Sequence, residues 1–220
     1  MPAPGVRFAH VAFDLDGTLI DSRHDLASSV NHVLRTMRLP ELDPKTLYGY
    51  VGEGARVLVE RALGPDRCAR FEEGVGLFME YYGDHLLDAT RPYPGMVELL
   101  NALAERGVAL SVLTNKPLGL SRTILDGLAL TPRFVGVIGG DSLPTRKPDP
   151  AGLEELRRLT GTPRERTLLV GDSGIDVETA RAGRVAFCGV SWGLSPDALV
   201  AATPERVVDD AADILRLVAS

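Results

Sequence analysis

The chain has 220 residues, of which 45% are hydrophobic and 25% charged, and its formal net charge is −6. This composition is typical of a soluble globular protein, and the lack of a basic block argues against nucleic acid as a partner. No apolar run approaches the roughly 18 residues that span a membrane, the N-terminus does not resemble a signal peptide, and Cys68 and Cys188 lie far apart, so we expect no membrane partner and a cytoplasmic protein.

The first predicted element is a buried strand over residues 8–13, with His10 as its one polar interruption. Asp14 and Asp16 follow it directly, and Gly17 comes next. Residues two apart in an extended chain share a side, so both carboxylates are expected to face one cavity at the carboxyl end of the strand. Ligands usually bind at that end of an open α/β sheet. Two carboxylates this close repel each other, and a bound cation or a shared proton would relieve that repulsion. The alternative interpretation is a polar turn with an aspartate cap.

Residues 22–91 show helical periodicity and no strand pattern. Asp21 or Ser22 is expected to cap a first helix that runs to about Met37, and Pro40 and Pro44 are expected to break it. Further helices are predicted over 46–50, 54–63 and 65–87. This block is therefore interpreted as a small helical unit inserted after the first strand.

From residue 92 onward, predicted strands alternate with predicted helices. Strands are expected over 108–113, 134–138, 167–170, 185–190 and 207–208. The helices between and after them are expected over 94–106, 118–128, 150–159, 174–182, 196–201 and 210–218. This alternation predicts a parallel sheet that is covered by helices on both faces.

Two later segments carry groups suited to a phosphate. Thr114 and Asn115 end the second long strand just before a helix, where donors meet the positive end of a helix dipole. Lys147 stands before two prolines and can neutralise a phosphate or hold a carboxylate. An ordinary helix cap and a solvated surface lysine are the alternatives, and we expect Arg146 to be solvated.

Asp172 and Asp176 follow the fourth strand, again among small residues. Four aspartates at two strand ends, with no histidine nearby, favour a hard cation that prefers oxygen ligands, and we expect Mg²⁺. A helix cap explains either of these aspartates singly, but not why two apolar strands end in the same way.

In this order, DxDGT at 14–18, Thr-Asn at 114–115, Lys147 and GDxxxD at 171–176 resemble the motifs of the haloacid dehalogenase superfamily of aspartate-nucleophile phosphotransferases. Longer segments at 14–22, 91–95, 114–117, 139–141, 146–150 and 171–173 are similar to its phosphoglycolate phosphatases. The resemblance covers nearly the whole chain. It implies an α/β fold with a Rossmann-like parallel-sheet core over 1–21 and 92–220, the first strand lying between the second and the fourth, and a helical cap domain over 22–91. Arg23 and His24 depart from the usual apolar residue and proline at the cap hinge.

The resemblance also implies a Mg²⁺-dependent phosphomonoester hydrolase that acts on a small phosphorylated metabolite. Asp14 would attack phosphorus to form an aspartyl phosphate, and Asp16 would act as general acid and then as general base. The expected metal ligands are Asp14, Asp172, Asp176 and the backbone carbonyl of Asp16. The groups expected to bind the phosphoryl group or the rest of the substrate are Thr114, Asn115, Lys116 and Lys147.

The inserted unit is expected to select the substrate. Gly52 and Gly54 free backbone amides at a helix start and Arg56 adds a guanidinium, so we expect these residues to bind the carboxylate of 2-phosphoglycolate. A helix cap with a solvated arginine is the alternative. Other functions left open are a pyrophosphatase or sugar-phosphate phosphatase, a β-phosphoglucomutase-like phosphotransferase and a non-enzymatic binding protein. We expect a monomer or a homodimer.

Overall fold

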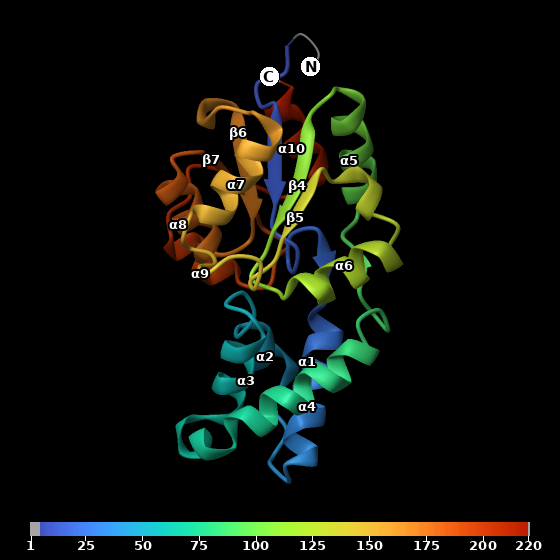
Figure 1. Cartoon of the computed structure of the whole chain (residues 1–220), viewed down its shortest axis with the longest axis vertical. Helices are drawn as coiled ribbons and strands as arrows, with labels where there is room; N and C mark the ends of the chain where they lie inside the picture. The colour runs from blue at the N-terminus through green and yellow to red at the C-terminus, as the bar shows by residue number, and fades with distance from the viewer. Residues whose placement is uncertain (1–4, 220) are drawn as a thin grey trace.

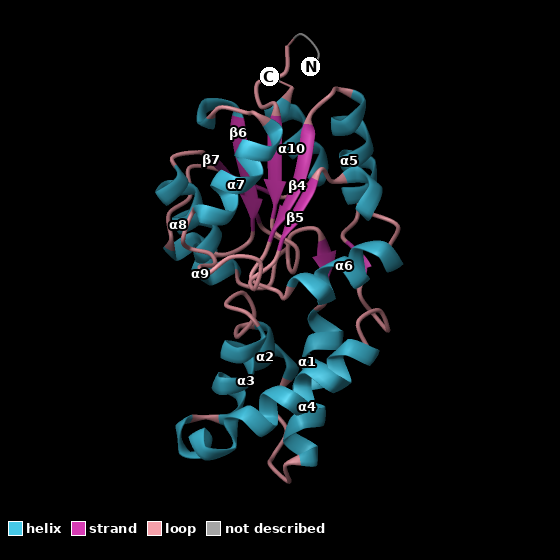
Figure 2. Cartoon of the chain, viewed as in Figure 1, coloured by secondary structure: helices cyan, strands magenta, loops and turns pink. Residues whose placement is uncertain are grey.

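The structure is a computed structural model that describes residues 5–219, and they form two lobes (Figure 1). One lobe is a sheet with helices on both faces, and the other is built from helices alone (Figure 2). Between them lies the edge of the sheet at which its strands end (Figure 1). Among the described residues, no helix combines the length and the apolar character needed to cross a bilayer.

The sheet has six parallel strands, as predicted. Their order is β5–β4–β1–β6–β7–β8, so β1 lies between β4 and β6. Phe13 of β1 is level with Val112 of β4 and Val170 of β6, and the residues that follow all three strands therefore meet at one edge. The bounds of the strands are His10–Phe13 for β1, Ala109–Leu113 for β4, Gly136–Ile138 for β5, Thr167–Gly171 for β6, Ala186–Val190 for β7 and Val207–Val208 for β8.

The strands are mostly apolar because both faces of the sheet are covered, and the buried His10 and Ser111 side chains hydrogen-bond to each other at 2.7 Å. Val11 and Phe13 pack in the cluster that includes α5 (Met96–Glu105) and α10 (Ala211–Val218). Ala12 faces the other way and packs with leucines of α7 (Ala151–Thr160) and apolar residues of α8 (Gly174–Gly183). The remaining helices of this lobe are α6 (Leu118–Gly127), α9 (Pro196–Ala201) and the short 3-10 turns η2 (Thr131–Arg133) and η3 (Arg164–Arg166).

The helical lobe comprises α1 (Arg23–Thr36), α2 (Pro44–Tyr48), α3 (Ala55–Leu63), η1 (Pro65–Arg70) and α4 (Phe71–Asp84). Two details differ from the sequence prediction. Pro44 begins α2 instead of breaking a helix, because the first turn needs no amide from it and Asp43 caps the turn by accepting from the Lys45 amide at 2.8 Å. The helix predicted over 65–87 is divided, since Arg67 has a non-helical φ of −119° within η1.

The chain crosses between the lobes twice, through β2 (Ile20–Asp21) and β3 (Arg91–Pro92), which pair antiparallel. Two-residue strands carry no alternation pattern, so the sequence did not reveal them. The buried carboxylate of Asp25 on α1 secures this junction by accepting from the Thr90 amide at 2.8 Å, from the Thr90 hydroxyl at 2.7 Å and from the Ala89 amide at 3.0 Å. Arg23 adds an ion pair to Asp21 at 2.6 Å. His24, by contrast, is exposed.

Substitution of the junction carboxylate tests this description. We expect Asp25→Asn to lower the free energy of unfolding by about 2 kcal/mol, because hydrogen bonds to a charged acceptor are lost and buried donors lose their partner. Chemical denaturation followed by circular dichroism measures the change. Asp88→Asn is the matched control, since Asp88 is exposed and pairs only with His85 in this region. Equal stability of the two variants would show that Asp25 does not hold the junction.

Candidate active site

Four segments from distant parts of the sequence meet at the edge of the sheet facing the helical lobe. Asp14 directly follows β1, Thr114 follows β4, and Asp172 follows β6. Lys147 comes from the loop between β5 and α7. Parallel neighbours and a level register bring these side chains to one place, as the strand-end argument predicts.

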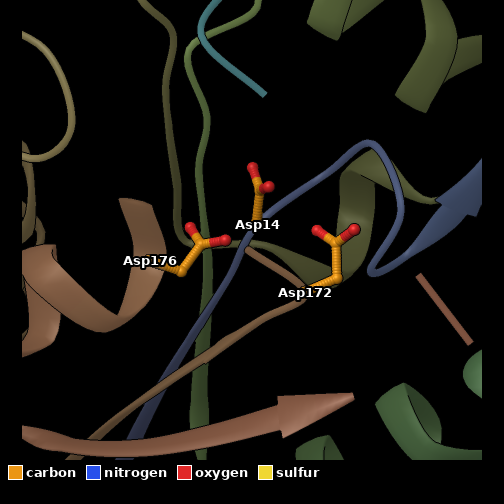
Figure 3. Close-up of side chains that lie close together, drawn as sticks. All are labelled: Asp14, Asp172 and Asp176. Atoms are coloured by element: carbon orange, nitrogen blue, oxygen red, sulfur yellow. The ribbon is translucent and has the colours of Figure 1, made fainter. Parts of the chain in front are cut away.

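Three buried carboxylates form the centre of the site (Figure 3). Asp14, Asp172 and Asp176 each place an oxygen within 4.8 Å of the others. The Lys147 ammonium lies 2.8 Å from Oδ1 of Asp14 and 2.7 Å from Oδ1 of Asp176. Three negative charges and one positive charge leave two negative charges uncompensated in this cluster. An all-oxygen donor set with that residual charge fits a hard divalent cation such as Mg²⁺.

The ionisation of these groups reflects the same imbalance. Burial, followed by the charges of Asp14 and Asp176, raises the pKa of Asp172 to about 8. Burial also raises the pKa of Asp14 to about 6, although Lys147 opposes the shift. For Lys147, burial alone would lower the pKa, but the two carboxylates outweigh it and raise that pKa. A bound metal ion would favour the ionised form of Asp172 and so offset both its burial and its repulsion by Asp14 and Asp176.

Close backbone approach fixes the position of Asp172. Its Oδ2 accepts from the Leu194 amide at 2.7 Å. Gly17 has a φ of +84°, and a β-carbon there would lie 2.3 Å from Asp172 Oδ2. A β-carbon on Gly193 would lie 2.2 Å from the β-carbon of Asp172. Only glycine therefore fits at these two positions.

Asp176 is held by the first turn of α8. The Ser173 hydroxyl donates to Asp176 Oδ2 at 2.6 Å, and the Asp176 amide donates back to Ser173 Oγ in a capping box. Its other oxygen, Oδ1, accepts from Lys147. Asp176 is thus both part of a helix cap and a member of the charged cluster. The helix-cap interpretation and the charged-site interpretation are therefore compatible.

A second ion pair lies beside the first cluster. The Lys116 ammonium is 3.0 and 2.9 Å from the two oxygens of Asp16 and 2.7 Å from the Tyr82 hydroxyl. The Ser22 hydroxyl donates to Asp16 at 2.5 Å. Ser22 occupies the N-cap position of α1 but makes no side-chain cap bond, whereas the Asp21 carboxylate, the other predicted cap, accepts from the Arg23 amide at 3.3 Å. Lys116 was expected to bind substrate, but in this structure its charge is taken up by Asp16.

Thr114 and Asn115 are buried at the cleft, but they use their polar groups differently. Thr114 Oγ1 accepts from the Lys116 amide at 3.2 Å, which leaves its hydroxyl proton to donate. Asn115 donates from Nδ2 to the Gly52 carbonyl and to the Lys147 carbonyl, both at 3.1 Å. The side-chain amide that was expected to hold a phosphoryl oxygen instead ties the helical lobe to the lysine loop.

The cleft lies between the two lobes. The sheet lobe contributes Asp14, Asp16, Thr114, Asn115 and Lys116, whereas the helical lobe contributes residues of the 51–55 loop together with Leu58, Phe78 and Tyr82. Gly52 and Gly54 therefore line the cleft, as expected. Burial of a tyrosine in an apolar helix stripe predicts only that its hydroxyl has some partner, so Tyr82 was missed as a site residue.

Arg56 is not brought to this site. It pairs with Glu72 of α4, and its guanidinium lies 4.7 Å above the Phe71 ring. The side chain is about half exposed and does not line the cleft. Its position at the start of α3 matched the expectation, but the face of the helix on which it lies did not.

Known proteins resemble this chain over most of its length. A family model described as haloacid dehalogenase-like hydrolase matches residues 11–190. The chain is 39% identical over 212 residues to a phosphoglycolate phosphatase of Rhodospirillum rubrum, which covers 93% of this chain and 88% of the relative. It is 37% identical to a phosphoglycolate phosphatase of Mesorhizobium japonicum, with coverage of 83% and 82%.

Solved structures agree with the fold. A crystal structure described as a predicted phosphoglycolate phosphatase from Haemophilus somnus superposes with a TM-score of 0.90 at 34% identity. The match covers 96% of this chain and 98% of that one. The lobes and their connection are thus shared over essentially the full length of both chains.

The raised pKa of Asp172 makes a prediction about stability. An unfolded aspartate ionises near pH 4, whereas folded Asp172 stays protonated to about pH 8, so ionisation favours the unfolded state increasingly between these values. We expect Asp172→Asn to stabilise the metal-free protein at pH 8 by at least about 1 kcal/mol, or roughly 2–4 °C in Tm, and to have much less effect at pH 4.

Thermal unfolding in EDTA at both pH values measures this difference. Addition of Mg²⁺ at pH 8 should raise the Tm of the wild-type protein and leave that of the variant nearly unchanged. A variant that is less stable than wild type at pH 8 in EDTA would contradict the charge imbalance described above.

Proposed function

This chain belongs to the haloacid dehalogenase-like hydrolase family, and on that basis we propose that it is a phosphatase of small phosphomonoesters with 2-phosphoglycolate as its substrate. The observation that carries the proposal is the position of Asp14: it is buried at the end of β1, paired with Lys147 at 2.8 Å, and it lines the cleft. The names of the relatives that are 37–40% identical support the choice of substrate.

The helical lobe is proposed to act as a cap. In this proposal residues 22–91 form the cap domain, and residues 1–21 with 92–220 form the catalytic core. The hydrogen bond from Asn115 to Gly52 and the contact of Lys116 with Tyr82 support it, since both cross the cleft. The protein is proposed to be a monomer or a homodimer.

Mg²⁺ is the proposed cofactor, held by Asp14, Asp172, Asp176 and the backbone carbonyl of Asp16. When bound, it would offset the negative charge of the carboxylates and of the phosphoryl group. The chain's own groups add to this effect, because the Lys147 ammonium is next to Asp14 and the Thr114 hydroxyl can donate a hydrogen bond to a phosphoryl oxygen.

The reaction is proposed to proceed in two displacements. An oxygen of Asp14 attacks phosphorus, the bond from phosphorus to the ester oxygen breaks, and the alcohol leaves with a proton from Asp16. Water then attacks the aspartyl phosphate, gives its proton to Asp16 and releases inorganic phosphate as the bond to Asp14 breaks. The 2.5 Å bond from Ser22 and the Lys116 ion pair hold Asp16 in place, and Asp16 must exchange its Lys116 contact for a proton before it can act as the acid in the first step.

Replacement of the nucleophile tests the mechanism. We expect Asp14→Asn to lower kcat by at least about 10³-fold, because the amide cannot form the intermediate. Circular dichroism should show an unchanged fold. A variant that retains the wild-type kcat for phosphate release would exclude Asp14 as the nucleophile.

A substrate panel tests the specificity. We expect Mg²⁺-dependent phosphate release with the highest kcat/KM for 2-phosphoglycolate, compared with pyrophosphate, glucose phosphates and p-nitrophenyl phosphate, and no release after chelation. A flat profile would keep the phosphatase but reject the substrate. Turnover of a glucose phosphate only with a bisphosphate activator would instead indicate a mutase.

A further inference from the structure

The cationic side chains that border the cleft differ in whether a carboxylate already pairs with them. Lys147 is paired with Asp14 and Asp176, and Lys116 is paired with Asp16. Both ammonium groups are buried. They serve the reacting centre, so neither is free to recognise a second anionic group on a substrate.

Arg146 is different. It is exposed, and within residues 5–219 its guanidinium has no carboxylate within ion-pair distance. It precedes Lys147 in the chain and lines an open cavity of about 760 Å³ that also borders Lys147 and Asn115. In the sequence, nothing distinguishes Arg146 from a solvated surface arginine.

The side chain of Arg146 extends from the sheet lobe toward the helical lobe. A β-carbon built on Gly54 would lie 3.7 Å from Nη1 of Arg146. Gly54 lines the cleft that contains Asp14, and Asn115 lines both that cleft and the cavity of Arg146. The guanidinium therefore lies at the rim of the active site, where the two lobes meet.

Three carboxylates line the same cavity, and one of them is neutralised by a cation. Glu53 pairs with Arg61, and Asp149 accepts from the Ala151 amide at 2.9 Å at the start of α7. Glu178 is exposed and is not within ion-pair distance of Arg146. Among the lining residues, an anionic group that enters the cavity would thus meet Arg146, which has no ion-pair partner, and the unpaired carboxylates of Asp149 and Glu178.

We propose that Arg146 is a specificity-determining residue that binds the carboxylate of a short phosphomonoester substrate. A planar guanidinium can hold a carboxylate through two parallel hydrogen bonds. A carboxylate one carbon away from the ester oxygen stays close to the phosphoryl group, so its partner must be a cation at the border of the active site. Arg146 precedes Lys147 in the chain and lines the same cavity as Lys147 and Asn115. The inference rests on the proposed phosphatase function and assigns to Arg146 the role that the sequence suggested for Arg56.

A pair of matched substrates tests this assignment. 2-Phosphoglycolate and 2-hydroxyethyl phosphate have similar size but differ in the carboxylate. We expect Arg146→Ala to raise KM about ten-fold or more for the first ester and less than about two-fold for the second, with Arg146→Lys intermediate. An unchanged kcat for the second ester would show that the neighbouring Lys147 is undisturbed. Arg122→Ala on α6 controls for removal of an exposed arginine.

Calorimetric binding of 2-phosphoglycolate to the Mg²⁺-loaded Asp14→Asn protein gives a readout without turnover. Adding Arg146→Ala should weaken binding about ten-fold. Equal effects on both esters, unchanged binding, or a selective effect of Arg56→Ala instead would overturn the assignment. A wild-type preference for 2-hydroxyethyl phosphate would reject 2-phosphoglycolate as the natural substrate. The role of Arg146 is tested separately, by the ratio of KM between the variant and the wild type for each ester.

Discussion

The burial of three carboxylates beside one ammonium is the constraint on which the rest of the site depends. Buried charges are costly unless they are paired, and Lys147 pairs with only two of the three carboxylates. The raised pKa of Asp172 is the consequence. The surrounding backbone cannot relax this arrangement, because Gly17 and Gly193 leave Asp172 no room to move away. Without a bound cation, the unpaired negative charge of this cluster lowers the stability of the fold. A divalent cation fits the site because it would compensate that charge.

The contacts that close the cleft also organise its charges. Tyr82 of the helical lobe meets Lys116, which in turn neutralises Asp16, so the position of that lobe bears directly on the proposed acid and base. Asn115 joins the Gly52 carbonyl of one lobe to the Lys147 carbonyl of the other. Movement of the helical lobe would therefore alter both ion pairs together. The junction at Asp25, in the first turn of α1, limits such movement.

The sequence predicted the sheet and the meeting point of the motifs because both follow from main-chain rules. Apolar runs of strand length, separated by helices, imply parallel strands, and parallel strands bring Asp14, Thr114 and Asp172 to one edge. It could not predict the partners of long or amphipathic side chains. Arg56 pairs with Glu72, sixteen residues later, and the Asn115 amide binds two carbonyls, because both choices depend on how α3 and its loop pack in three dimensions. The two-residue strands β2 and β3 were equally invisible, since pairing alone defines them.

These limits also explain why a substrate-selecting residue is hard to recognise in the sequence. Inside the cleft, a cation is distinguished by its partners, and Lys147 and Lys116 both have them. At the rim, a cation is distinguished by the absence of a partner, which only the three-dimensional arrangement reveals. Arg146 satisfies that criterion, while the neighbouring carboxylate of Glu53 is occupied by Arg61. Separation of catalysis from substrate recognition has a physical advantage. The charged residue at the rim can be replaced to suit another substrate without a change in the charges that surround Asp14.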